Sequence, residues 1–147
     1  SVCITGSRGG PIGLAVLALD PRMKMYIANM PTNNRWDWQV TYPAAWGWGP
    51  NASDQPAGMT REDYIRLLSY FDPSHFAERV TQPVLINLGL LDDLSQVSGN
   101  LACFVRLAST RKDLQLLPWG GHDAASPEWH ALADRWVREL FGATTAQ

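Results

Sequence analysis

Three residues whose types could carry out nucleophilic catalysis occur along the chain in the order Ser7, Asp92, His122. A serine hydroxyl attacks a carbonyl carbon when a histidine takes its proton, and a carboxylate holds that histidine in the correct tautomer. Ser7 lies in the segment Thr5–Gly10, which reads Thr-Gly-Ser-Arg-Gly-Gly between a strand-like run and a helix-like run. This layout is typical of a sharp turn that exposes a serine between a strand and a helix. The backbone N–H of Arg8 would then lie at a helix N-terminus, where it could stabilise an oxyanion.

Each of these residues also has a simpler interpretation. Thr5 replaces the first glycine of the G-x-S-x-G pattern, and a Gly-Ser-Arg-Gly-Gly stretch by itself is more often a plain turn. Asp92 could be a loop or cap acid, and Asp93 is its rival for the acid role. His122 follows two glycines in a loop, which argues against a histidine packed in a core. The two other histidines are predicted to be ordinary helix-surface or helix-cap residues: His75 and His130.

The three residues follow segments that are predicted to be strands. Short apolar runs indicate strands, and apolar residues at three- to four-residue spacing indicate helices. Ser7, Asp92 and His122 therefore stand at three successive strand ends, in the chain order of α/β-hydrolases, and together they are more specific than any one of them. The predicted strands are Val2–Ile4, Met25–Asn29, Val84–Leu88 and Leu114–Leu117, and the predicted helices are Ile12–Leu19, Ser95–Leu107, Pro127–Phe141 and one that Thr60 caps.

The composition excludes several other functions. The chain has 147 residues and a formal net charge of -2, with no basic run or stripe, so it lacks the electrostatic footprint of a nucleic-acid-binding protein. No apolar stretch reaches membrane-spanning length, and no signal peptide is visible. Cys3 and Cys103 are predicted to be small core residues without disulfide or zinc-site spacing, which is compatible with a reducing compartment such as the cytoplasm. We expect neither a metal nor another cofactor, and neither a nucleic acid nor a membrane as a partner.

The least regular part of the chain is rich in tryptophan. The segment Met30–Met59 breaks the strand and helix pattern with Pro, Gly and Asn residues. A long irregular segment within a compact domain is usually functional or disordered, and the aromatic content argues against disorder. We therefore expect one partial domain over residues 1–147, with a tryptophan-rich lid or pocket insertion over 30–70. The alternatives are an oligomer contact or a small core beneath a loop. The tryptophans concerned are Trp36, Trp38, Trp46 and Trp48.

Several motifs of the chain resemble those of the acetyl xylan esterase and cephalosporin-C deacetylase family, carbohydrate esterase family 7. The family's serine turn reads Gly-Gly-Ser-Gln-Gly-Gly, and Thr5–Gly10 stands in its place. Gly89–Asp92 falls on the family's Gly-Leu-x-Asp, with Asp92 as the acid, and His122 falls on its Gly-His. The resemblance is to the C-terminal half of the family's proteins and spans nearly the whole chain. Further matching segments are Ala18–Lys24, Leu68–Asp72, Phe76–Val80 and Pro83–Leu85.

The resemblance implies an α/β-hydrolase fold, with a mostly parallel sheet and helices on both of its faces. It also implies a serine hydrolase that cleaves small carboxylic esters, above all acetyl esters of sugars, through the three residues named above. Glucuronoyl-esterase-like and prolyl-oligopeptidase-like hydrolases are alternatives, as is a non-catalytic subunit that serves binding or assembly. Some residues depart from the family pattern, and these departures bear on the identity of the substrate more than on the type of reaction. They are Thr5, Arg8, Pro11 and the pair Gln96–Val97.

An α/β-hydrolase needs more sheet than four strands supply. The strand before Ser7 normally lies in the middle of the sheet, and here it comes at the start of the sequence, so one of its edges would be bare. We therefore expect a second chain, or an N-terminal half of the same polypeptide, to complete the sheet within a homo- or hetero-oligomer. In the family, the second oxyanion donor comes from such an earlier segment. A rival nucleophile is Ser1, with its own amine as the base.

Overall fold

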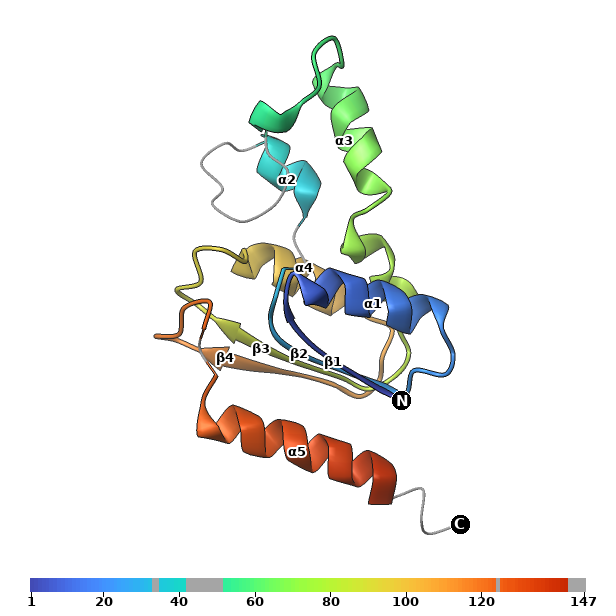
Figure 1. Ribbon diagram of the computed structural model, residues 1–147, viewed down its shortest axis with the longest axis vertical. Helices are drawn as coiled ribbons and strands as arrows, with labels where there is room; N and C mark the ends of the chain where they lie inside the picture. The colour runs from blue at the N-terminus through green and yellow to red at the C-terminus, as the bar shows by residue number, and fades with distance from the viewer. Residues whose placement is uncertain (33–34, 42–51, 124, 143–147) are drawn as a thin grey trace.

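A four-stranded parallel sheet forms the centre of the molecule (Figure 1). The computed structural model describes residues 1–32, 35–41, 52–123 and 125–142. The strands are β1 (Val2–Ser7), β2 (Met25–Pro31), β3 (Val84–Gly89) and β4 (Lys112–Leu117). They lie in the order β1-β2-β3-β4, and each neighbouring pair is parallel. Their C-terminal ends therefore share one side of the sheet, which we call the carboxyl edge.

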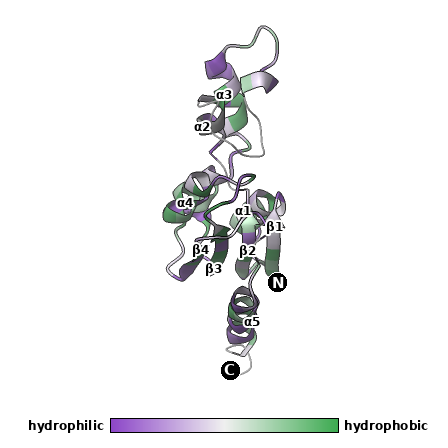
Figure 2. Cartoon of the chain, turned by 90° about the vertical axis from the view of Figure 1, so that its left-hand side faces the viewer, coloured by the Kyte–Doolittle hydropathy of each residue, from purple (hydrophilic) through white to green (hydrophobic). Residues whose placement is uncertain are grey.

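Helices cover both faces of this sheet. α1 (Gly9–Leu19) and α4 (Val97–Arg106) lie on one face, and α5 (Pro127–Gly142) lies on the other (Figure 1, Figure 2). Parallel neighbours require a long connection from the end of one strand to the start of the next, and each connection here contains helix. The arrangement confirms the predicted α/β class. Short 3-10 turns lie at Ala52–Asp54, Pro73–His75 and Ala77–Arg79.

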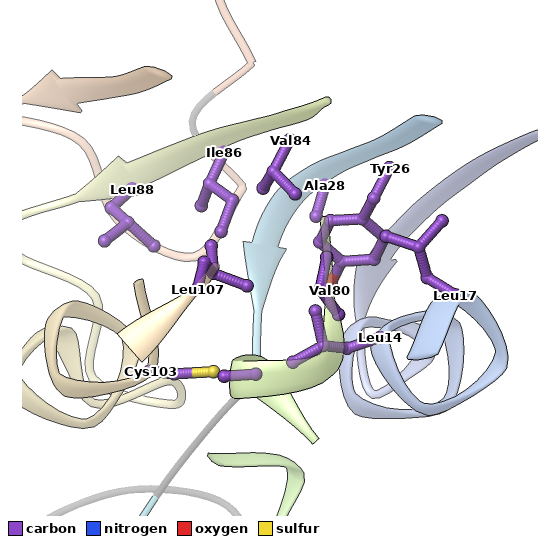
Figure 3. Close-up of a cluster of buried hydrophobic side chains, with 11 residues drawn as sticks. Leu14, Leu17, Tyr26, Ala28, Val80, Val84, Ile86, Leu88, Cys103 and Leu107 are labelled. Atoms are coloured by element: carbon purple, nitrogen blue, oxygen red, sulfur yellow. The ribbon is translucent and has the colours of Figure 1, made fainter. Parts of the chain in front are cut away.

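The larger apolar cluster lies between the sheet, α1 and α4 (Figure 3). Leu14 and Leu17 of α1 are buried there together with Tyr26 of β2 and Cys103 of α4. The Tyr26 hydroxyl also donates a hydrogen bond to the carbonyl oxygen of Gly10 at 2.9 Å. Full burial of one large apolar side chain contributes about 1.5–3 kcal/mol. This cluster therefore anchors α1, and with it the turn before α1, on the sheet.

A second apolar cluster holds α5 against the opposite face. Trp129 and Trp136 are buried on α5, and because they lie about two helical turns apart they share one side of it. They belong to one cluster with Met25 and Ile27 of β2 and Leu85 of β3. Since successive side chains of a strand point to opposite faces, β2 supplies both clusters in alternation.

α2 (Trp36–Thr41) and α3 (Arg61–Ser69) project from the sheet as a small lobe (Figure 1). This α2–α3 lobe has an apolar core of its own, and Trp36 packs against it. The buried residues of that core are Val40, Tyr64 and Leu68.

The tryptophan-rich insertion falls largely outside the described residues. Trp46 and Trp48 lie in 42–51, and the side chain of Trp38 is likewise not described. Trp36 is partly buried and packs against the core of the α2–α3 lobe, a contact of the kind that the small-core alternative describes. A lid or pocket wall made by the others stays a prediction.

β1 runs directly into the serine turn. The strand continues to Ser7 and is therefore longer than the predicted Val2–Ile4. α1 also starts earlier than predicted, at Gly9. The early start depends on Gly10, because a Cβ atom there would lie only 2.8 Å from the Cα of Pro31. The turn thus places the first residues of α1 almost in contact with the end of β2.

A side-chain hydrogen bond fixes the start of α3, whereas α4 starts later than the sequence predicts. The Thr60 hydroxyl oxygen accepts a hydrogen bond from the Asp63 N–H at 3.1 Å, which confirms the predicted cap of α3. α4 begins at Val97 and not at the predicted Ser95. The backbone N–H of Ser95 instead donates to the carboxylate of Asp92 at 2.8 Å.

β1 forms an exposed edge of the sheet. In the part of the chain that the structure describes, β2 is the only strand that pairs with it. Ile4 of β1 is 69% exposed, and Ile12 and Leu19 of α1 are 63% and 61% exposed. We refer to these exposed side chains of β1 and α1 together as the β1–α1 flank. It corresponds to the bare edge that the sequence predicts.

Candidate active site

Ser7 lies at the apex of the turn between β1 and α1. Its φ of 46° is in the left-handed region, which is uncommon for a residue with a side chain and stores strain. The backbone N–H of Thr32 donates to the Ser7 carbonyl oxygen at 2.9 Å and helps to hold the turn. A strained strand-to-helix turn of this kind presents the serine oxygen at the carboxyl edge.

His122 connects Ser7 with Asp92. Its Nε2 lies 2.8 Å from Ser7 Oγ, and its Nδ1 lies 2.9 Å and 3.1 Å from the two carboxylate oxygens of Asp92. An ionised carboxylate can only accept, so Nδ1–H donates to Asp92 and Nε2 accepts from the Ser7 hydroxyl. This is the hydrogen-bond geometry that a histidine needs to act as a general base on a serine.

The Asp92 carboxylate is buried and well supplied with donors. Its side chain is 2% exposed, against 22% for His122. The backbone N–H groups of Leu94 and Ser95 donate to Asp92 Oδ1 at 2.9 Å and 2.8 Å. These bonds offset the lost hydration of a buried charge. Asp93 is exposed, so of the two candidate acids it is Asp92 that contacts the histidine.

Gly89 allows the loop that carries His122 to lie directly over the end of β3. A Cβ atom at this position would lie 2.6 Å from the carbonyl carbon of Gly120 and 2.6 Å from the carbonyl oxygen of Gly121. No side chain fits there without moving backbone. The sequence carries only a weak signal for this contact, namely a glycine at a strand end and two glycines before the histidine.

The other possible nucleophiles are poorly placed or unreactive. Ser1 precedes β1, and a strand of that length separates it from Ser7 by about 20 Å. Ser1 is therefore remote from His122. Burial raises the pKa of the Cys3 thiol, and it raises the pKa of Cys103 to about 12. Both thiols thus stay protonated at neutral pH, and the thiolate is the reactive form.

Arg8 lies between Ser7 and the first residue of α1. A backbone N–H at this place belongs to the N-terminus of a helix, whose partial positive charge favours an oxyanion. The role of this N–H in an oxyanion hole stays a prediction.

The two other histidines lie at the surface. His75 is exposed in a 3-10 turn and His130 is exposed on α5, as the sequence predicts for surface histidines. Over the described ranges, no three His, Cys, Asp or Glu side chains gather in a way that could hold a metal ion. Among those same residues, no helix is both long enough and apolar enough to cross a bilayer.

Two buried residues with hydroxyl groups lie beside the site and could not be identified from the sequence. Thr32 follows β2, Ser95 follows the acid loop, and their side-chain oxygens lie 3.0 Å apart. Ser95 Oγ also lies 3.4 Å from Nδ1 of His122. Only the position of Ser95 just after Asp92 could have suggested a contact, because an aspartate often accepts from the N–H groups that follow it.

The parallel sheet, its two helical layers and the placement of these residues at the carboxyl edge define an α/β-hydrolase fold. Acetyl xylan esterase 1 from Thermoanaerobacterium sp. JW/SL YS485 has the same fold, with a TM-score of 0.77, 24% identity, and coverage of 95% of this chain and 45% of that chain. An acetyl xylan esterase from Paenibacillus sp. R4 gives a TM-score of 0.74 with 26% identity, over 92% of this chain and 43% of that one.

The chain belongs to the acetyl xylan esterase (AXE1) family, whose model matches residues 1–140. The curated acetyl esterase Axe7A of Xylanibacter ruminicola is 29% identical over 89 residues, which are 60% of this chain and 20% of that protein. The family membership confirms the resemblance that the sequence motifs indicate. The chain spans less than half the length of each of these relatives.

Proposed function

We propose that this chain carries the catalytic triad of a serine esterase that removes acetyl groups from sugars. The observation that carries the proposal is the continuous hydrogen-bond chain from Ser7 through His122 to Asp92. Membership of the acetyl xylan esterase family supports an acetylated sugar as the substrate. The names of the relatives, acetyl xylan esterase and acetyl esterase, agree with this substrate class.

In the proposed mechanism the reaction takes two steps. Ser7 Oγ attacks the acetyl carbonyl carbon while His122 Nε2 takes the hydroxyl proton, and the N–H of Arg8 donates to the resulting oxyanion. His122 then gives its proton to the departing sugar oxygen, which leaves an acetyl group on Ser7. A water molecule, deprotonated by His122, attacks this acetyl-serine and releases acetate. Asp92 stabilises the imidazolium that forms in both steps.

We propose further that another segment or chain covers the β1–α1 flank. A parallel edge with exposed apolar side chains is a surface that folded proteins usually cover. The two similar esterase structures are longer, since this chain covers only 45% and 43% of them. The covering part would add strands beside β1 and supply a second oxyanion donor next to Ser7.

Active-site labelling of the natural protein that contains this chain tests the proposed function. A fluorophosphonate probe is expected to modify Ser7, and Ser7→Ala is expected to abolish both labelling and hydrolysis of acetylated xylan oligosaccharides. Ser69→Ala is the matched control and leaves both unchanged, because the Ser69 hydroxyl donates within α3, to the Arg66 carbonyl oxygen at 2.7 Å. Labelling that persists in Ser7→Ala contradicts the triad. Labelling of Ser7 together with cleavage of other esters only would keep the serine hydrolase and refute the sugar substrate.

A further inference from the structure

We infer that the hydroxyl groups of Thr32 and Ser95 form a brace that positions His122 between Ser7 and Asp92. This inference rests on the proposed function of the same site. Thr32 and Ser95 are positioning residues, because they act through the histidine and not on the substrate. Both side chains are buried, at 4% and 1% exposure, so their polar groups have no access to bulk water. Buried hydroxyl groups need partners within the protein, and these two find them beside the triad.

The Thr32–Ser95 brace connects all three members of the triad. The Thr32 N–H donates to the carbonyl oxygen of Ser7 at 2.9 Å, and Thr32 Oγ1 lies 3.0 Å from Ser95 Oγ. The Ser95 N–H donates to Asp92 Oδ1 at 2.8 Å, and Ser95 Oγ lies 3.4 Å from Nδ1 of His122. Two residues thereby join the end of β1, the acid loop after β3 and the histidine loop after β4.

The tautomer of His122 fixes the direction of its contact with Ser95. Nδ1 of His122 carries a hydrogen because it faces the Asp92 carboxylate, so it cannot accept one from Ser95. Ser95 Oγ must therefore accept from the same N–H, which is shared between two acceptors. At 3.4 Å this contact is longer than an ordinary N–H···O bond of about 2.9–3.0 Å, so Asp92 is the main acceptor and Ser95 the second. The hydroxyl groups of Ser95 and Thr32 form a further hydrogen bond, in which either of them can be the donor.

The brace matters most when His122 becomes a cation. During the reaction the ring takes the Ser7 proton, and a second acceptor beside Nδ1–H then favours the charged form and resists rotation of the ring. Loss of that acceptor slows proton transfer without removing a contact to the substrate. We therefore expect Ser95→Ala to lower the rate constant for modification of Ser7 roughly three- to tenfold, with the half-saturating probe concentration unchanged.

A matched pair of substitutions at Thr32 separates hydrogen bonding from packing. Thr32→Val keeps the shape of the side chain and removes its hydroxyl, whereas Thr32→Ser keeps the hydroxyl and removes the methyl group. We expect Thr32→Val to share the defect of Ser95→Ala and Thr32→Ser to behave like the wild type. Ser109→Ala is the control, because Ser109 is also buried but its hydroxyl donates to the Arg111 carbonyl oxygen at 2.9 Å, before β4 and away from the carboxyl edge.

Nuclear magnetic resonance gives a readout that does not depend on activity. The ¹⁵N shifts of the two His122 ring nitrogens report which of them carries the proton, and they can be recorded on the natural protein that contains this chain. We expect the Nδ1–H tautomer in every variant, because Asp92 stays the main acceptor. The shift of the Nδ1 nitrogen itself should change in Ser95→Ala and Thr32→Val, which lose the second acceptor or its support, and stay as in the wild type in Thr32→Ser. Thermal unfolding of each variant establishes that it is folded under the conditions in which its spectrum is compared with that of the wild type.

The two readouts distinguish failure of the brace from failure of the proposed function. Ring-nitrogen shifts that are unchanged in both Ser95→Ala and Thr32→Val overturn the brace, even where the wild type reacts with the probe. Equal defects in Thr32→Ser and Thr32→Val also overturn it, since they assign the effect to packing. If the wild type does not react with the fluorophosphonate but the ring shifts move as expected, the brace stands and the proposed function fails.

Discussion

The carboxyl edge and the β1–α1 flank differ in how completely their side chains are partnered. At the carboxyl edge, Asp92 is 2% exposed on its side chain and accepts hydrogen bonds from His122 and from two backbone N–H groups. On the flank, Ile4, Ile12 and Leu19 each leave well over half of their surface in water. The polar groups of the candidate site are thus satisfied within the chain, whereas the apolar groups of the flank are not buried by it.

This difference separates two physical requirements of the fold. Hydrogen bonds act over about 3 Å, so three strand ends and the loops beside them can satisfy the triad by themselves. Burial of apolar surface is non-directional and grows with the area removed from water, so only a further layer of structure could bury the exposed side chains of the flank. The geometry of the three candidate residues is therefore a local property, while the proposed cover of β1 and α1 would act on the stability and association of the chain.

The largest effect is expected at the carboxyl edge, from Asp92→Asn. An amide in place of the carboxylate no longer selects the Nδ1–H tautomer of His122, so the base faces Ser7 with the wrong nitrogen. By analogy with other serine hydrolases, kcat is expected to fall on the order of 10³- to 10⁴-fold. The measurement is ester hydrolysis by the natural protein, with folding followed by circular dichroism.

Asp93→Asn is the matched control for that substitution. Asp93 is the neighbouring acid and is exposed, so its amide variant is expected to retain the wild-type kcat. A large loss in Asp93→Asn with none in Asp92→Asn would transfer the acid role to Asp93. The sequence leaves these two residues as rivals, because only the fold determines which carboxylate is turned towards the histidine.

The strands and main helices could be predicted because their signals are local and periodic. The buried run Val84–Leu88 and the stripe of apolar residues on α5 identify their elements without knowledge of the partner. Ser7, Asp92 and His122 could be named as candidates because each follows a strand, and strand ends meet at one edge of a parallel sheet. The structure brings the three together, and the fold class and family are confirmed.

Contacts between distant loops could not be predicted in the same way. Thr32 and Ser95 are small polar residues without periodic spacing, and their contact joins segments that are far apart in the sequence. The close passage of the histidine loop over Gly89 depends on the paths of two backbones, which no propensity encodes. The extent of β1 as far as Ser7 likewise follows from pairing with β2, not from the residues of β1 alone.

A smaller effect at the carboxyl edge is expected from Gly89→Ala. The added methyl group would meet the backbone of Gly120 and Gly121, so the loop that carries His122 must shift. We expect a loss of about 1–3 kcal/mol in the free energy of unfolding, the usual cost of overpacking. The modification rate of Ser7 should fall as well. Denaturant unfolding and fluorophosphonate labelling measure the two effects, with Gly142→Ala as the control, because a Cβ atom there meets nothing within 4 Å.

A substitution on the flank is expected to change the self-association of the chain and to leave catalysis unchanged. Leu19→Lys replaces an exposed apolar side chain with a charge at the C-terminal end of α1, where a cation is compatible with the helix dipole. Self-association of this chain through the flank should weaken roughly tenfold, measured by sedimentation equilibrium. Leu67→Lys changes an exposed leucine on α3 and should leave association as it is. Equal effects of the two substitutions would show that the flank is not the associating surface.

The smallest effect is expected at the polar rim of the flank, from Asp20→Asn. Hydrogen bonds from the Arg22 side chain and backbone hold the pKa of Asp20 at about 2, below its ordinary value of 3.8. Because the folded-state pKa is lowered, the stability that Asp20 contributes is present above pH 3.8 and is lost as the pH falls towards 2. Arg22 is exposed and Asp20 is partly exposed, so water and salt screen the pair. The denaturant midpoint falls between about pH 5 and pH 2, and we expect this fall to be only slightly smaller in Asp20→Asn than in the wild type. In the natural protein a covered flank would shield the pair from water, and the same substitution should then have a larger effect. An equally small effect in this chain and in the natural protein would mean that Asp20 and Arg22 stay in water in both. The proposed covering layer would then end before the C-terminal end of α1.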